Sequence, residues 1–166
     1  MNWTKFFKAQ KQLDGHIVKE KGLEGQDLLD KKILALQVEL GELTNELPEL
    51  FKFWSDKKNN YERALEEYID VFHFLLSIGL EINVTDGFET YESYHDIREA
   101  INAIHLNSTV LIDESFADIE FDKRMYKDMF QCFITLGKKL GFTWEQIEKS
   151  YLAKNKINHD RQENSY

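Results

Sequence analysis

Apolar residues recur every three or four positions along most of the chain, which is the spacing of amphipathic α-helices. The pattern predicts six helices, over about 4–21, from 27 or 30 to 47, and over 61–81, 91–106, 123–140 and the stretch after Thr143. Pro48 is hard to accommodate inside a helix, so we expect the second helix to kink there and continue to Trp54. Residues 108–122 are ambiguous. Turn signals flanked by alternating apolar residues are absent, so the sequence predicts an all-α helical bundle.

Residues that commonly end or cap helices support these boundaries. Gly22 and Gly141 each follow a periodic apolar stretch, and glycine is the usual residue just past a helix end. Thr143 is a predicted N-cap, with Glu145 and Gln146 in the first turn of the last helix. The run 71–80 in the third helix is too apolar to be exposed, so we expect that half of the helix to be buried.

Length, charge and cysteine content limit the classes of protein. At 166 residues the chain is predicted to form one domain, residues 1–166. A net charge of −9 argues against binding a nucleic-acid polymer, which requires clustered Lys and Arg. A run of 18 apolar residues is absent, so no membrane partner is expected. Cys132 is the only cysteine and cannot form an internal disulfide, so we expect a cytoplasmic protein.

Three glutamates of the second predicted helix share one face. At about 100° per residue, Glu39, Glu42 and Glu46 fall on a stripe roughly 60° wide. Val38 and Leu43 flank this stripe, and the helix is apolar nearly all round through Ile33, Leu34, Leu36, Leu40 and Leu47. We therefore expect the acidic stripe to point inward. Ionised carboxylates that share a poorly hydrated site repel one another, and a divalent cation is the natural compensation.

A second acidic pair strengthens this interpretation. Glu-x-x-Glu alone is weak evidence, because a chain this acidic contains about five such acidic pairs by chance. Glu67-x-x-Asp70 lies on the next long helix, and two helices joined by a short connection can bring both pairs to one place. Oxygen ligands on rigid helices suit Mg²⁺. The alternative is a solvated acidic face, which fits Glu62 and Glu66 better than Glu67 or Asp70.

Other polar residues are candidates for substrate contacts. Gln10 and Asp14 lie one turn apart on the first helix, where an amide can offer both a donor and an acceptor. Lys154, Asn158 and Arg161 recur at helical spacing, as a cationic stripe suited to phosphate or as an ordinary exposed helix face. Trp54 can stack on a base or fill the core. His73 precedes Phe74 in an apolar run, where a histidine is more often a hydrogen-bonded core residue than a ligand.

Several stretches resemble the dimeric dUTPases of bacteria and their phages, which belong to the all-α NTP pyrophosphohydrolase (MazG-like) superfamily. The stretches are ALQVELGELTNE at 35–46, FKFWS at 51–55, EEYIDVFHFLLS at 66–77 and YLAKNKINHDRQ at 151–162. The resemblance spans nearly the whole chain. It implies a helical homodimer that uses Mg²⁺ to hydrolyse dUTP, and dUDP as well, to dUMP.

The resemblance also implies roles for individual residues. Glu39, Glu42, Glu67 and Asp70 would be the metal ligands, with Glu39 and Glu42 as the candidates for orienting the attacking water. The predicted substrate-binding residues are Gln10, Asp14, Trp54, Phe74, Lys154, Asn158 and Arg161. The chain departs from the family at Asp14, where other branches have Asn, and at residues 163–166, where a terminal Gly-Tyr would be expected.

Three alternatives to a dUTP diphosphatase stay open from the sequence. A broader dCTP or NTP pyrophosphohydrolase of the same superfamily would use the same acidic residues. An HD-type phosphohydrolase would use His95-Asp96 or His159-Asp160 as its metal-binding pair, but it leaves the glutamate stripe unexplained. A non-catalytic helical dimer would act by protein contact, with a regulatory partner that the sequence does not identify.

Overall fold

The structure is a computed structural model that describes residues 2–88, 96–112 and 119–164. Within these ranges it is all-α, with no strand and six α-helices. The elements are α1 (Trp3–Lys21), α2 (Leu29–Asn45), the short 3-10 helix η1 (Pro48–Leu50), α3 (Tyr61–Glu81), α4 (Ile97–Ile112), α5 (Ile119–Lys139) and α6 (Trp144–Glu163). Among the described residues, none of these helices is long and apolar enough to cross a membrane.

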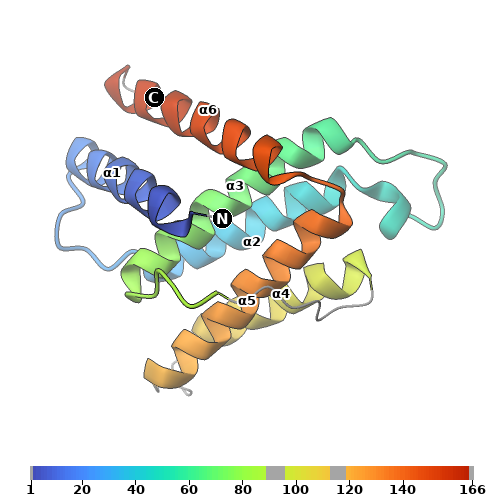
Figure 1. Ribbon diagram of the computed structural model, residues 1–166, viewed down its shortest axis with the longest axis horizontal. Helices are drawn as coiled ribbons and strands as arrows, with labels where there is room; N and C mark the ends of the chain where they lie inside the picture. The colour runs from blue at the N-terminus through green and yellow to red at the C-terminus, as the bar shows by residue number, and fades with distance from the viewer. Residues whose placement is uncertain (1, 89–95, 113–118, 165–166) are drawn as a thin grey trace.

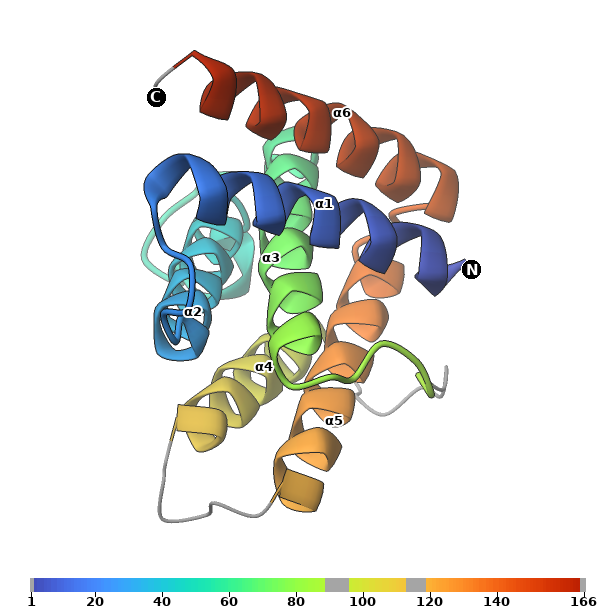
Figure 2. The same ribbon diagram turned by 90° about the vertical axis from the view of Figure 1, so that its left-hand side faces the viewer.

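Helix α3 lies at the centre of the bundle (Figure 1). It packs against α2 along its length and also contacts α1, α5 and α6. Figure 2 shows α1 and α6 running side by side across one end of α3, while α4 and α5 form a pair at the other end. The central position explains the burial of the apolar run, since every residue from Val71 to Gly79 except Phe74 is buried. The predicted burial of this half of the helix is confirmed.

Side-chain caps and a glycine mark several helix ends, among them the predicted ones at Gly22 and Thr143. Gly22 follows α1 with a left-handed backbone at φ 63°, which a residue with a side chain rarely adopts. The side chain of Asn60 accepts a hydrogen bond from the Arg63 N–H at the start of α3. Thr143 and Gln146 form a reciprocal capping box at the start of α6. These local signals fix where the helices begin and end.

Three boundaries differ from the predictions. Helix α2 ends at Asn45, and Pro48 begins the separate turn η1 instead of kinking a longer helix. Proline suits the first position of a new turn, because the N–H that it lacks has no partner there. Helix α4 starts at Ile97 and runs to Ile112, six residues past its predicted end, and α5 starts at Ile119. The earlier predicted start of α4, at residues 91–95, lies outside the described residues.

The extension of α4 has a local cause. Ser108 and Thr109 look like helix breakers in the sequence, but both hydroxyls donate to the His105 carbonyl, at 2.8 and 2.9 Å. A hydroxyl that is bonded back to the preceding turn no longer competes with the helix. Ser108 is fully buried and also accepts a hydrogen bond from Gln37 of α2. The polar stretch is therefore part of the packing between α2 and α4.

Two tyrosine–glycine contacts hold α5 against α3. Tyr68 donates to the Phe133 carbonyl at 3.1 Å, and Tyr126 donates to the Leu75 carbonyl at 2.8 Å. Each ring lies over a glycine of the facing helix, Gly137 and Gly79 respectively. A Cβ added at Gly137 would lie 2.3 Å from the Tyr68 hydroxyl oxygen. These glycines are needed for close approach of the helices.

Replacing Gly137 with alanine should therefore destabilise the protein, by about 1–3 kcal/mol, because an added methyl overpacks a rigid contact. Gly15→Ala is the matched control: Gly15 is an exposed helical glycine with nothing near its absent Cβ. That change should stabilise by roughly 0.5–1 kcal/mol through helix propensity. Urea unfolding of both variants checks the contrast, and equal midpoints would show that the Tyr68–Gly137 contact is not tight.

Candidate functional site

Three carboxylates from two helices meet at one point. Glu39 comes from α2, and Glu67 and Asp70 come from α3; one oxygen of each lies within 4.8 Å of the others. Glu67 is buried, while Glu39 and Asp70 are half-buried. Because α2 and α3 are long helices packed side by side, the backbone holds these groups together despite their repulsion. Glu39 of the first sequence pair and both members of the second pair are thus brought to one locus.

The crowding changes the acidity of the cluster. The pKa of Glu39 is raised from 4.5 to about 7, first by burial and then by the charges of Asp70, Glu42 and Glu67. The pKa of Glu67 is raised by burial and by Asp70 and Glu42. Each group therefore favours its neutral form more than an isolated glutamate does, and the cluster is destabilised when all its members are ionised.

The expectation of an inward acidic stripe holds for only part of α2. Glu39 and Glu46 are half-buried, but Glu42 is exposed and lies outside the close cluster, although its charge is felt by Glu39 and Glu67. Leu34 and Val38, whose apolar character suggested that the stripe points inward, are 60% and 52% exposed. Helix α2 has an apolar exposed face as well as an apolar buried one, which the residue pattern alone does not distinguish.

Protein cations neutralise the cluster in part. The Lys154 ammonium of α6 lies 2.5 Å from Asp70 Oδ2, and the Arg63 guanidinium lies 3.5 Å from Glu67 Oε1. One lysine and one distant arginine leave excess negative charge, since Glu39 and Glu42 add to the same field. Clustered carboxylate oxygens of this kind fit Mg²⁺, a hard cation that prefers oxygen ligands. Glu39, Glu67 and Asp70 are the residues that could hold such an ion, and Glu42 lies outside this group.

A cavity of about 300 Å³ adjoins the carboxylates. Its apolar lining residues are Leu13, Ile17, Val18, Leu23, Leu28 and Phe74. Its polar lining residues are Gln10, Asp14, Lys31, Lys32, Asp70, His73, Ser77 and Asn158. Asp70 belongs both to this lining and to the carboxylate cluster. The cavity and the cluster therefore form one continuous site.

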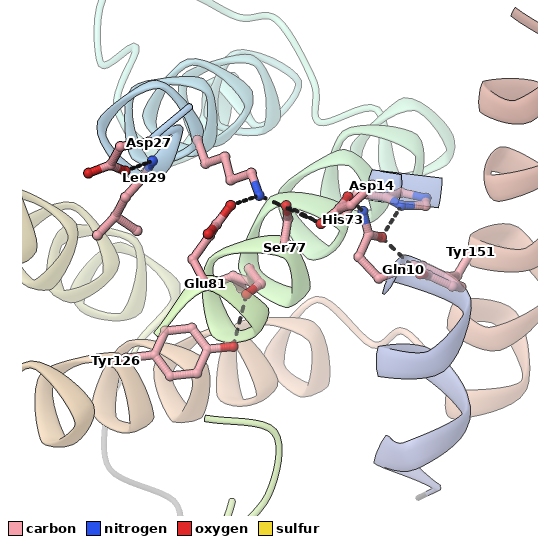
Figure 3. Close-up of polar contacts among 11 residues, drawn as sticks. Gln10, Asp14, Asp27, Leu29, His73, Ser77, Glu81, Tyr126 and Tyr151 are labelled. Carbon is pink, nitrogen blue, oxygen red and sulfur yellow. Dashed lines mark hydrogen bonds and ion pairs between the residues drawn. The ribbon is translucent and has the colours of Figure 1, made fainter. Parts of the chain in front are cut away.

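A hydrogen-bond network links several polar residues that line the cavity (Figure 3). Gln10 donates from Nε2 to Asp14 Oδ1 at 2.7 Å, and Ser77 donates to Asp14 Oδ2 at 2.6 Å. Gln10 Oε1 lies 2.8 Å from His73 Nδ1 and 2.9 Å from the Tyr151 hydroxyl. Lys32, which ion-pairs with Glu81, lies 3.7 Å from Asp14 Oδ2. The network joins α1, α2, α3 and α6.

The structure gathers most, though not all, of the predicted substrate-binding residues. Gln10, Asp14, Phe74 and Asn158 line the cavity, and Lys154 lies at the carboxylates. Arg161 instead lines a separate groove beside Lys154, between α3 and α6. Trp54 follows η1, is 66% exposed and contacts the rings of Phe51 and Phe53. Trp54 is not among the cavity residues of this chain.

Sequence reasoning missed Lys32, Ser77 and Tyr151 as members of the site. Ser77 had a readable signal: it follows Asp70 and His73 at helical spacing and is a polar residue inside an apolar run. Tyr151 and Lys32 carried no such signal, because their roles depend on how α6 and α2 pack across α1 and α3. Tertiary packing decides which polar residues of an amphipathic helix enter a site.

The HD-type alternative finds no support in this geometry. His159 Nδ1 lies 2.8 Å from His16 Nδ1, and the metal-compatible cluster found in the described part of the chain contains no histidine. His95 lies outside the described residues. Glu39, which this alternative leaves unexplained, is one of the three carboxylates that converge.

The raised pKa values predict how stability changes with pH in metal-free protein. Between pH 4.5 and 7 the folded state binds more protons than the unfolded state, because the pKa of Glu39 is higher when folded. The contribution of Glu39 to the unfolding free energy should therefore fall as pH rises through this window, by about 1 kcal/mol after allowance for solvent screening. The lowered pKa of buried His73 acts in the opposite direction, so the test compares variants and not the wild type alone. Melting temperatures are measured in EDTA at pH 5.5 and 8. The melting temperature of Glu39→Gln relative to wild type should rise between these pH values, whereas that of exposed Glu62→Gln should not; an unchanged difference for Glu39→Gln contradicts the account.

Comparison with known proteins places this geometry in a family. A search of curated proteins gives no match. A family model described as dUTPase matches residues 2–166, essentially the whole chain, including both acidic pairs and α6. The all-helical architecture and the converging carboxylates agree with that match. The chain belongs to the dUTPase family.

Proposed function

We propose that this chain is a Mg²⁺-dependent dUTP diphosphatase that hydrolyses dUTP, and dUDP as well, to dUMP. The observation that carries the proposal is that Asp70 belongs both to the carboxylate cluster and to the lining of the cavity, so the two adjoin. A nucleotide also has two joined parts, an anionic phosphate chain and a base with its sugar. The carboxylate cluster would take the phosphate chain with its cation, and the adjoining cavity would take the base and sugar. The family assignment supports the same substrate.

The size of the cavity supports this division. At about 300 Å³ it lies at the small end of ligand sites, which are typically about 300–1,000 Å³. It suits a nucleoside, with the phosphate chain extending toward the carboxylates. Among the lining residues, Phe74 offers a ring surface and Asn158 offers an amide. Lys154, already bonded to Asp70, is placed to share its charge with a phosphate oxygen.

Each residue of the cluster has a task in this mechanism. A Mg²⁺ ion held at the cluster would supply Lewis-acid chemistry: it would stabilise negative charge on phosphate oxygens and lower the pKa of a water molecule. Glu39, Glu67 and Asp70 would hold the ion. Glu39 is also a candidate for orienting the attacking water; a bound cation would lower the pKa of this carboxyl below its metal-free value of about 7. Glu42 is exposed at the rim, where it can orient water.

Glu39→Gln should lower kcat/KM for dUTP at least about a hundredfold, because it removes the charge of a metal ligand at nearly constant shape. Glu62→Gln, an exposed change on α3, is the control and should retain wild-type turnover. Release of pyrophosphate with Mg²⁺ is measured for dUTP, dCTP, dTTP and UTP, and release of phosphate is measured for dUDP. A strong preference for dUTP supports the proposal. Equal use of dCTP indicates the broader pyrophosphohydrolase, and no turnover indicates the non-catalytic dimer.

The proposal includes a homodimer, which is supported by exposed apolar side chains. Leu34 and Val38 lie one turn apart on the outer face of α2, and Phe53 and Trp54 are 95% and 66% exposed. A second copy of the chain would cover such residues in a self-complementary interface.

The proposal also includes a cytoplasmic location, because the lone, buried Cys132 suits a reducing cytoplasm.

Leu34→Glu combined with Val38→Glu should convert the protein from a dimer to a monomer at micromolar concentration, since the change buries charge in an apolar interface. Leu152→Glu, a similar change at a half-exposed position of α6, should leave the mass unchanged. Light scattering after size exclusion measures the mass against the 19.7 kDa of one chain. A wild type that runs as a monomer removes the dimer from the proposal.

A further inference from the structure

The side chain of Gln10 is held by partners on both ends of its amide. It is 3% exposed, and its oxygen lies near two groups that can donate, His73 Nδ1 and the Tyr151 hydroxyl. Its nitrogen donates to Asp14 Oδ1 at 2.7 Å. The reversed amide would place the Gln10 oxygen against a carboxylate oxygen, which is a contact between two acceptors. Asp14 therefore fixes which way the amide points.

The direction of the amide determines the proton position on His73. Gln10 Oε1 can only accept hydrogen bonds, so the histidine nitrogen at 2.8 Å must carry a hydrogen. The ring is neutral in this setting, because burial lowers the pKa of His73 to about 3. A neutral ring with hydrogen on Nδ1 has a bare lone pair on Nε2. Stacking of the ring on Tyr151, at 4.3 Å between centroids, holds it in place.

The bare nitrogen is an acceptor in need of a donor. His73 Nε2 is buried and has no hydrogen-bond partner among the described residues. A buried acceptor without a partner is unfavourable, so a ligand that brings a donor gains affinity. His73 lines the cavity, which is where such a donor would arrive.

We propose that Asp14 is a positioning residue: through the Gln10 amide it holds His73 with hydrogen on Nδ1, so that Nε2 accepts a hydrogen bond from a donor of the bound nucleotide. The inference rests on the proposed function for the identity of the ligand, but not for the state of His73. It reverses the expectation that Gln10 supplies the acceptor for the base, because the Gln10 oxygen is already used by His73 and Tyr151.

The surroundings of Asp14 fit this indirect role. Its two oxygens accept from Gln10 and Ser77, and the Lys32 ammonium lies 3.7 Å from one of them. Lys32 and Asp14 are largely buried, at 15% and 18% side-chain exposure, so each compensates the other's charge. An asparagine at this position could donate or accept, and it would leave the Gln10 amide free to turn. The aspartate found in this chain enforces a single direction.

The first experiment needs no nucleotide. Long-range ¹H–¹⁵N NMR distinguishes the two neutral forms of a histidine ring, and His73→Gln identifies the His73 signals. The wild type should show hydrogen on Nδ1 alone. Asp14→Asn should give a mixture of both forms, whereas Ser77→Ala, which keeps the Gln10–Asp14 bond, should match the wild type. Hydrogen on Nε2 in the wild type, or an unchanged spectrum in Asp14→Asn, would overturn the proposal.

Kinetics distinguish positioning from a merely structural role. Asp14→Asn should raise KM for dUTP about tenfold while kcat stays within about twofold, because the carboxylate cluster is untouched. A fall in kcat without a change in KM contradicts a role in binding. The melting temperature of the variant should stay near that of the wild type, and a loss of folding would contradict the positioning role.

The final experiment identifies the donor. A non-hydrolysable dUTP analogue with Mg²⁺ is compared with its N3-methyl and 3′-deoxy derivatives while the His73 Nε2 signal is followed. The parent compound should shift that signal, and the derivative that binds without the shift identifies the donor as the base N–H or the sugar O–H. A parent compound that binds without shifting the signal, or two derivatives that shift it equally, overturns the nucleotide contact. Absence of any binding overturns the proposed function instead, while the His73 result in free protein still tests the positioning by Asp14.

Discussion

Repulsion among Glu39, Glu67 and Asp70 is the constraint around which the site is built. The three carboxylates stay within 4.8 Å of one another because the rigid packing of α2 on α3 prevents them from separating. Behind them lies a core in which Leu36, Leu40 and Tyr68 are almost completely buried. A softer backbone would relax and disperse the charge. Stability contributed by the core is thus used to maintain an unfavourable arrangement that a cation makes favourable.

The second half of the site depends on α1 and α6, which cross one end of α3. Lys154 brings α6 to the carboxylates, and Tyr151 ties the same helix to Gln10 of α1. Because one helix contacts both parts, the position of α6 couples the charge cluster to the cavity. Most polar groups of the network are hydrogen-bonded to other protein groups and so are not available to a ligand. His73 Nε2 has no such partner among the described residues, which makes it a candidate contact for the ligand.

Sequence reasoning worked where the physics is local. Helical periodicity, the Gly22 and Thr143 signals and the spacing of Glu67 and Asp70 are properties of neighbouring residues, and the structure has the corresponding helices and caps. Prediction was weaker for features that depend on packing between residues far apart in the sequence. The exposure of Glu42 and the true end of α4 depend on which faces meet. In the sequence, Gln10 is a plausible contact for the base. In the fold, its oxygen already has partners on α3 and α6, the His73 ring and the Tyr151 hydroxyl.

The central claim is that the crowded carboxylates form a cation site, and proton release on Mg²⁺ binding tests it most directly. Calorimetric titrations at pH 7 in two buffers of different ionisation enthalpy give both the affinity and the number of protons released. Because the pKa of Glu39 is about 7 without metal, binding should be saturable and should release about half a proton per site at pH 7, and less at pH 8.5. Weak, non-saturable heat at both pH values, or the same binding and proton release in Glu39→Gln, would contradict the account.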